Sequence, residues 1–196
     1  MTPPVPLTAG ELSPLLNALS ALPAPALVGI DGRCGAGKSA LAARLGAALG
    51  CPVFPMDHFF LPPALRTPAR LARPGGNVHH ERVLEQVILP FLAGAGVTYA
   101  PFDCHAGALA QPLTFPPAPL GIVEGSYALH PALAGHYART LFLTCSPAQQ
   151  RRRLLTREGP QRAEVFFRRW IPLEEAYFSA LGLPEGCTWV LDTTGV

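Results

Sequence analysis

Apolar residues recur along the chain with two different spacings, and the alternation of these spacings predicts the fold class. Short continuous apolar runs are typical of buried strands. Such runs cover residues 26–31, 51–56, 120–124, 140–145 and 188–192.

The segments between these runs place apolar residues three and four positions apart, which predicts helices. The predicted helices cover residues 12–22, 38–49, 78–92, 146–157 and 162–181. Because strands and helices alternate, we expect an α/β fold with a mainly parallel sheet that is covered on both faces.

Local signals refine the ends of these elements. Residues Thr8 to Glu11 are expected to form a capping box, in which the Thr8 side chain accepts a backbone N–H of the first turn and the Glu11 side chain accepts the backbone N–H of Thr8. Pro23 and Pro25 end that helix. Ser146-Pro147 is a favourable helix start. Residues 57–77 and 101–119 are rich in Pro and Gly or lack periodicity, so we expect irregular loops there.

Length and composition place the chain among single globular domains. It has 196 residues, of which 49% are hydrophobic, and its formal net charge is +2. We therefore expect one domain over 1–196, with 1–25 as an N-terminal helical extension and about 146–165 as a lid region. The near-zero charge gives no electrostatic basis for binding nucleic acid. We expect no nucleic-acid partner and leave open whether the protein forms a homo-oligomer.

Targeting signals and cysteine usage point to a cytoplasmic protein. No window approaches the ~18 continuous apolar residues of a membrane span. The N-terminus lacks the basic region of a signal peptide. The five cysteines are scattered and match no disulfide framework or zinc motif, as expected in a reducing compartment.

The basic residues are divided unequally, because fourteen are Arg and only Lys38 is Lys. Biased codon usage could have replaced Lys by Arg throughout the chain. The imbalance nevertheless excludes a Lys-rich nucleic-acid tail and a polybasic membrane segment. It also excludes the Asn-Lys-x-Asp motif with which GTPases read guanine, because Lys38 is followed by Ser-Ala-Leu.

The single lysine lies in a sequence that matches the phosphate-binding motif G-x-x-x-x-G-K-[ST], the P-loop. The motif comprises Gly32, Arg33, Cys34, Gly35, Ala36, Gly37, Lys38 and Ser39. Its glycines allow successive backbone N–H groups to face phosphate oxygens, and the next helix offers its N-terminus to an anion. Lys38 is expected to reach the β- and γ-phosphates of a nucleotide, and Ser39 to bind Mg²⁺. The alternative is a Gly-rich turn that matches by chance.

Two acidic residues lie at the ends of predicted strands. Asp57 follows the second apolar run and Glu124 ends a later one, and the carboxyl ends of parallel strands are where open α/β sheets bind ligands. Asp57 could accept a proton from a substrate hydroxyl or hold Mg²⁺ through water, and Glu124 could share the metal with Ser39. The alternatives are a turn aspartate and a satisfied buried carboxylate.

Arg153 and Arg157 lie four residues apart on a predicted helix and therefore share a face. Two guanidinium groups on one face suit a mobile lid that closes over phosphates. The alternative is a solvated basic face. Cys34 lies inside the P-loop, where its thiol is either a small filler or a group with a lowered pKa.

The ordered motifs resemble those of the uridine kinase-like family of P-loop kinases, particularly a bacterial nucleoside kinase-like branch. They are GIDGRCGAGKS (29–39), MDHFFLP (56–62), GNVHHERVLEQVILP (76–90), YAPFDCHAG (99–107), GIVEGSYALHP (121–131), RRRLLTREG (151–159) and RRWIPLEEAYF (168–178). The resemblance implies a P-loop NTPase three-layer sandwich with a helical lid. It also implies an ATP- and Mg²⁺-dependent enzyme that phosphorylates the 5′-hydroxyl of a nucleoside, most naturally one similar to uridine or cytidine.

The resemblance also implies roles for individual residues. Asp57 matches the family's base, which also approaches the metal, and Glu124 matches the acidic residue near Mg²⁺. Arg153 and Arg157 match lid arginines. The expected contacts to the small-molecule substrate come from Asp57, Phe59, His79, Phe102, Asp103 and His105.

One position departs from the family pattern. Residues 77–79 read Asn-Val-His, whereas the family usually has an Asp at the last position, where it accepts bonds from ribose hydroxyls. The imidazole of His79 can still bond a hydroxyl, but its charge depends on pH. This departure supports a second hypothesis, in which the protein binds nucleotide as a regulatory or assembly ATPase without a small-molecule acceptor.

Overall fold

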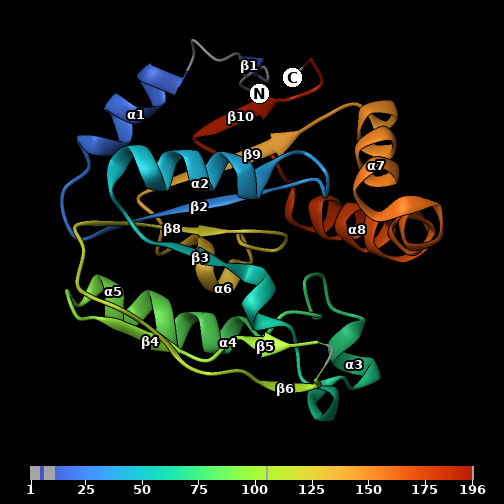
Figure 1. Ribbon diagram of the computed structural model, residues 1–196, viewed down its shortest axis with the longest axis horizontal. Helices are drawn as coiled ribbons and strands as arrows, with labels where there is room; N and C mark the ends of the chain where they lie inside the picture. The colour runs from blue at the N-terminus through green and yellow to red at the C-terminus, as the bar shows by residue number, and fades with distance from the viewer. Residues whose placement is uncertain (1–4, 7–11, 105, 196) are drawn as a thin grey trace.

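The computed structural model describes residues 5–6, 12–104 and 106–195. Its centre is a six-stranded sheet in the order β1-β10-β9-β2-β8-β3, in which all neighbouring strands run parallel (Figure 1). The strands are β1 (Val5–Pro6), β2 (Ala26–Gly32), β3 (Val53–Pro55), β8 (Leu120–Glu124), β9 (Arg139–Thr144) and β10 (Trp189–Asp192). The prediction of a parallel sheet in an α/β fold is confirmed.

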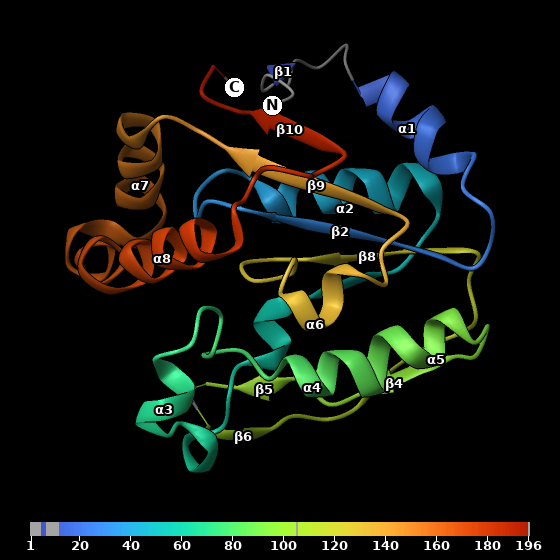
Figure 2. The same cartoon turned by 180° about the vertical axis from the view of Figure 1, so that it is seen from behind.

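Helices connect the strands and lie on both sides of the sheet. Those named below are α1 (Leu12–Ser20), α2 (Lys38–Leu49), α4 (His80–Val83), α5 (Leu89–Leu92), α6 (Pro131–Ala134), α7 (Pro147–Val165) and α8 (Ile171–Leu181). One π-helical turn, Leu84–Ile88, joins α4 to α5, and another, Phe166–Trp170, joins α7 to α8. Seen from behind, α6 lies in front of β8 while α2 lies beyond the sheet (Figure 2).

The central strand β2 shows how the sequence produces three layers. All seven of its residues are buried, and successive side chains of a strand point to opposite faces. Val28 and Ile30 belong to the hydrophobic core that contains residues of α1 and α2, whereas Leu27 belongs to the core on the other face. A strand that is buried on both faces therefore has a continuous apolar run, which in β2 covers residues 26–30 and ends at Asp31.

Two loop predictions are wrong in part. In residues 97–115, β4 (Val97–Tyr99) pairs with β7 (Leu113–Phe115), and β5 (Phe102–Asp103) pairs with β6 (Ala108–Leu109). Each of these strands has two or three residues, which is too short for a clear alternating pattern. Residues 57–77 contain 3₁₀ turns and the short helix α3 (Pro68–Leu71).

The predicted helices lie within two residues of their expected ends, except between residues 157 and 162, where the helical segment continues. The expected break near residue 160 occurs at Gly159, where φ is 75°, so α7 bends sharply there before it continues. The capping box at residues 8–11 lies outside the described residues. The expected N-terminal extension also contributes β1 to the edge of the sheet. Among the helices of the described ranges, none combines the length and apolar character required to cross a bilayer.

Candidate functional site

The turn from β2 to α2 forms an open cradle at the carboxyl end of the sheet. Gly32 has a φ of 136°, and a Cβ at this position would lie 2.0 Å from the carbonyl oxygen of Leu143, so only glycine allows the close approach to β9. Gly37 has a φ of 92°, and a Cβ there would meet no atom within 4 Å. This opening at the N-terminus of α2 suits the phosphate groups that the motif predicts.

Lys38 lies within the cradle and is 7% exposed. Its Nζ donates hydrogen bonds to the carbonyl oxygens of Gly32, at 2.6 Å, and Arg33, at 3.1 Å. These bonds hold the ammonium group beside the turn. Since an ammonium has three N–H donors, the geometry leaves one donor for a phosphate oxygen.

Ser39 and Glu124 meet although 85 residues separate them in the sequence. The Ser39 hydroxyl donates to Glu124 Oε2 at 3.2 Å, and Glu124 is 5% exposed. Burial raises the pKa of the Glu124 carboxyl, the hydrogen bond from Ser39 and the charge of Lys38 lower it, and the nearby charge of Asp57 raises it. Hydroxyl and carboxylate oxygens are the donors that Mg²⁺ prefers, so these residues fit the cation.

A cavity of about 510 Å³ connects the cradle to Asp57, whose side chain is exposed. Its walls come from the P-loop, from the segments that follow β3 and β8, from the segment before α4, and from α7, α8 and the π-helical turn between them. Residues of the cradle in the wall are Cys34, Gly35, Gly37, Lys38 and Ser39. The facing residues include Asp57, Phe60, Asn77, Val78, Ser126, Tyr127, Arg157, Phe166, Trp170 and Glu174.

A buried carboxylate that sequence reasoning missed lies behind this cavity. Asp31 is fully buried at the end of β2 and accepts four hydrogen bonds. The donors are the backbone N–H groups of Gly32, Tyr127 and Leu129 and the hydroxyl of Tyr177, at 2.7–3.2 Å. Burial raises the pKa of Asp31 to about 6, although the charge of Lys38 and the hydrogen bonds from Leu129, Gly32 and Tyr177 oppose this effect. The sequence feature that could have identified Asp31 is an acidic residue near the end of an otherwise apolar strand.

The same carboxylate holds a strained residue of the cavity wall. Tyr127 has a φ of 71°, a left-handed conformation that costs a non-glycine residue about 1–3 kcal/mol. Its backbone N–H is held by Asp31 at 3.2 Å, and its ring packs edge-on against Tyr177. Asp31 thus connects the start of the P-loop to the segment after β8 and to α8.

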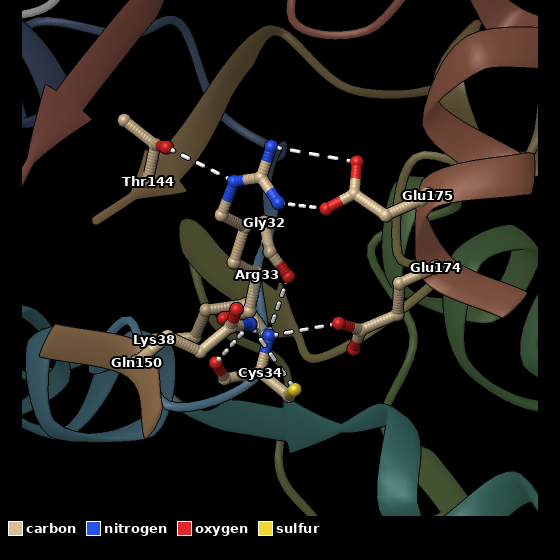
Figure 3. Close-up of polar contacts among 8 residues, drawn as sticks. All are labelled: Gly32, Arg33, Cys34, Lys38, Thr144, Gln150, Glu174 and Glu175. Carbon is tan, nitrogen blue, oxygen red and sulfur yellow. Dashed lines mark hydrogen bonds and ion pairs between the residues drawn. The ribbon is translucent and has the colours of Figure 1, made fainter. Parts of the chain in front are cut away.

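The first residues of the P-loop are bound by helices α7 and α8 (Figure 3). The guanidinium of Arg33 pairs with Glu175 and donates to Thr144 Oγ1, so it points away from the cavity. Gln150 donates to the carbonyl oxygen of Cys34 at 2.9 Å, and Glu174 accepts the Cys34 N–H at 2.9 Å.

The Cys34 thiol is a buried filler and not an activated nucleophile. Its side chain belongs to a small hydrophobic cluster with Leu154 and Ala163. Burial, followed by the negative charge of Glu174, raises its pKa to about 12. A thiol with this pKa remains protonated at neutral pH.

The structure separates the two expected lid arginines. Arg157 lines the cavity, where it donates to Glu158 and lies over the ring of Phe166. Arg153 instead donates to the carbonyl oxygens of Gly35, at 3.0 Å, and Thr193, at 2.5 Å. Arg153 therefore braces the back of the P-loop, and only Arg157 of the pair faces the site.

Several expected substrate contacts lie outside the cavity wall. Phe59 is 1% exposed in the hydrophobic core, and its neighbour Phe60 lines the cavity. Phe102 is 6% exposed, and Asp103 is an exposed residue that accepts the N–H of Ala106. His79 lies at the start of α4, while Asn77 and Val78 line the cavity. His105 lies outside the described residues.

Comparison with known proteins shows the fold. No family model and no curated protein matches the chain. Among solved structures, a possible uridine kinase from Bacillus stearothermophilus has a TM-score of 0.71 at 18% identity, with 92% of this chain and 97% of that one covered. A proposed fructose transport system kinase from Silicibacter sp. TM1040 has a TM-score of 0.65 at 22% identity, with 89% and 98% covered. The expected resemblance is therefore confirmed at the level of the fold, because the chain shares the architecture of these two solved structures.

Proposed function

We propose that the protein is a Mg²⁺- and ATP-dependent kinase that phosphorylates a hydroxyl group of a small molecule. The observation that carries this proposal is the single cavity that joins the phosphate cradle at Lys38 and Ser39 to the carboxylate of Asp57. A nucleoside similar to uridine or cytidine is the acceptor that the resemblance of the sequence motifs favours.

The residues of the cavity have different roles in phosphoryl transfer. The P-loop N–H groups and Lys38 hold the β- and γ-phosphates, and Ser39 and Glu124 hold Mg²⁺, which neutralises phosphate charge. Asp57 accepts the proton of the attacking hydroxyl, the oxygen of that hydroxyl bonds to the γ-phosphorus, and ADP leaves. Arg157 supplies positive charge from the α7 side.

The first test uses the fact that Lys38 is the only lysine. An acyl phosphate derivative of ATP should transfer its acyl group to Lys38 Nζ, which forms an amide as the acyl–phosphate bond breaks. Peptide mass spectrometry should find the label at residue 38, and excess Mg²⁺-ATP should abolish it. Lys38→Arg is the control that cannot form this amide. Labelling of Lys38 that Mg²⁺-ATP does not reduce would contradict the cradle.

The second test is acceptor-dependent release of ADP. The purified protein, Mg²⁺ and ATP are incubated with uridine, cytidine, D-ribose, D-fructose or glycerol, and ADP is measured against a sample without acceptor. We expect at least one acceptor to raise the rate well above that background. Failure of these and related alcohols to do so would contradict the kinase proposal.

A regulatory or assembly ATPase remains the second candidate. The observation that favours it is the position of His79, Phe102 and Asp103, which do not line the cavity that contains Asp57. Such a protein would bind Mg²⁺-ATP at Lys38 but would release ADP at the same rate with and without acceptors.

A further inference from the structure

Glu174 is a buried carboxylate of the cavity wall that is neither part of the P-loop nor at the end of a strand. It projects from α8 and is 4% exposed. Its Oε2 accepts the backbone N–H of Cys34 at 2.9 Å, and its Oε1 accepts the Ser126 hydroxyl at 2.6 Å (Figure 3 shows its position relative to the P-loop). These two donors fix the carboxylate between the start of the P-loop and the segment after β8.

The carboxylate retains the capacity to bind more donors. An ionised carboxylate offers about four acceptor positions, and the two observed bonds fill one on each oxygen. Within the described ranges, no Lys, Arg or His forms an ion pair with Glu174. Burying an anion without a cation is costly in free energy. A ligand with hydroxyl donors would lower this cost by donating hydrogen bonds to the Glu174 carboxylate.

Two neighbouring polar groups of the same wall are also incompletely hydrogen-bonded. Tyr127 Oη and Asn77 Nδ2 are buried and lie within reach of each other, and neither has a hydrogen-bond partner elsewhere among the described residues. Tyr127 is 4% exposed, and both residues line the cavity together with Glu174. Since buried polar groups are normally hydrogen-bonded, their arrangement around the cavity suits a ligand that both donates and accepts.

The charges of this wall restrict the kind of ligand. Asp57 and Glu174 contribute two carboxylates to the part of the cavity outside the P-loop, and a third carboxylate there, Glu158, is ion-paired with Arg157. Like charges repel strongly where water is excluded, so an anionic acceptor is disfavoured there. An uncharged molecule with several hydroxyl groups can instead donate to both carboxylates.

We propose that Glu174 binds hydroxyl groups of the acceptor other than the one that is phosphorylated, and thereby selects uncharged polyhydroxylated acceptors. This inference rests on the proposed kinase function. Glu174 then provides, from α8, the anionic hydroxyl acceptor that the sequence lacks at His79. Asn77 and Tyr127 complete the subsite.

The experiment compares Glu174→Gln with the wild-type protein. Gln has nearly the same shape but no charge, and it can keep only one acceptor oxygen. Using the acceptor that gives the highest rate in the ADP assay, we expect the KM for the acceptor to rise about 10-fold or more, as for the loss of a charge-assisted hydrogen bond. The KM for ATP should change less than threefold. Glu164→Gln, which removes an exposed carboxylate from α7, is the matched control and should leave both constants unchanged.

A deletion series on the substrate localises the effect. If uridine is phosphorylated, 2′-deoxyuridine and 2′,3′-dideoxyuridine should be poorer substrates of the wild type, and this penalty should shrink in Glu174→Gln. If a sugar is phosphorylated, its deoxy derivatives replace them. The wild type should also prefer an uncharged acceptor to an anionic counterpart with the same free hydroxyl groups, such as uridine to orotidine.

The outcomes separate this inference from the kinase proposal. Acceptor-dependent turnover together with an unchanged acceptor KM in Glu174→Gln would overturn the inference and leave the kinase proposal intact. An equal rise in the KM for ATP and for the acceptor would also overturn it, because Glu174 would then only brace the P-loop at Cys34. Absence of turnover with every acceptor would overturn both.

Discussion

Replacement of Asp57 by Asn is expected to lower kcat by roughly 10²- to 10⁴-fold, the usual contribution of a positioned general base. An amide of the same size cannot accept the proton of the attacking hydroxyl at neutral pH. The affinity for Mg²⁺-ATP should be nearly unchanged, because the cradle around Lys38 does not depend on Asp57. Acceptor-dependent ADP release gives kcat, and calorimetric titration with a non-hydrolysable ATP analogue gives the affinity.

The control for the Asp57 experiment is Glu164→Gln, which removes one negative charge from the exposed surface of α7. This variant should keep the wild-type kcat. If Asp57→Asn retains most of the activity, Asp57 is not the base. If it loses nucleotide affinity in parallel with activity, Asp57 contributes chiefly to the metal site.

Replacement of Asp31 by Ala is expected to lower the free energy of unfolding by about 3 kcal/mol or more. The substitution leaves four buried donors without their acceptor, and each unsatisfied donor costs about 1–3 kcal/mol in a non-additive way. It also removes the hydrogen bond that holds the backbone N–H of Tyr127 in place. For a chain of this length, the loss corresponds to a decrease in Tm of about 10 °C, measurable by scanning calorimetry.

The dependence on pH provides a second readout for Asp31. Its pKa is about 6 in the folded protein, against 3.8 for the ordinary group. Between these values the folded state binds more protons than the unfolded state, so stability from this group rises as the pH falls and is lost as the pH rises through 6. In the Asp31→Asn variant, which cannot titrate, the Tm difference from wild type should therefore depend on pH over this range. A difference that is constant from pH 4 to 7 would contradict the raised pKa.

The phosphate cradle illustrates what could be predicted locally. Backbone turns with positive φ strongly favour glycine, and a helix N-terminus follows from the next residues, so Gly32 to Ser39 specify the cradle within one short segment. The parallel sheet was also predictable, because strands buried on both faces require continuous apolar runs such as that of β2. In each of these cases, the determining interactions are close in sequence or follow directly from burial.

The acceptor side of the site could not be predicted in the same way. Phe59 and Phe60 are adjacent and chemically identical, yet one enters the core and the other lines the cavity. Arg153 and Arg157 share a helical spacing, but the carbonyl groups of Gly35 and Thr193 bind only Arg153. The direction of each side chain depends on partners that are distant in the sequence.

The sequence by itself determined the α/β class, the position of the P-loop and the candidate roles of Lys38, Ser39, Asp57 and Glu124. Only the tertiary structure brought Ser39 to Glu124, enclosed Asp31 with its four donors and placed Glu174 beside the P-loop. The reason is physical: a local pattern specifies backbone conformation and burial, whereas the meeting of residues 85 or 140 positions apart depends on how strands and helices pack. The part of the site that selects the acceptor is built from such distant contacts.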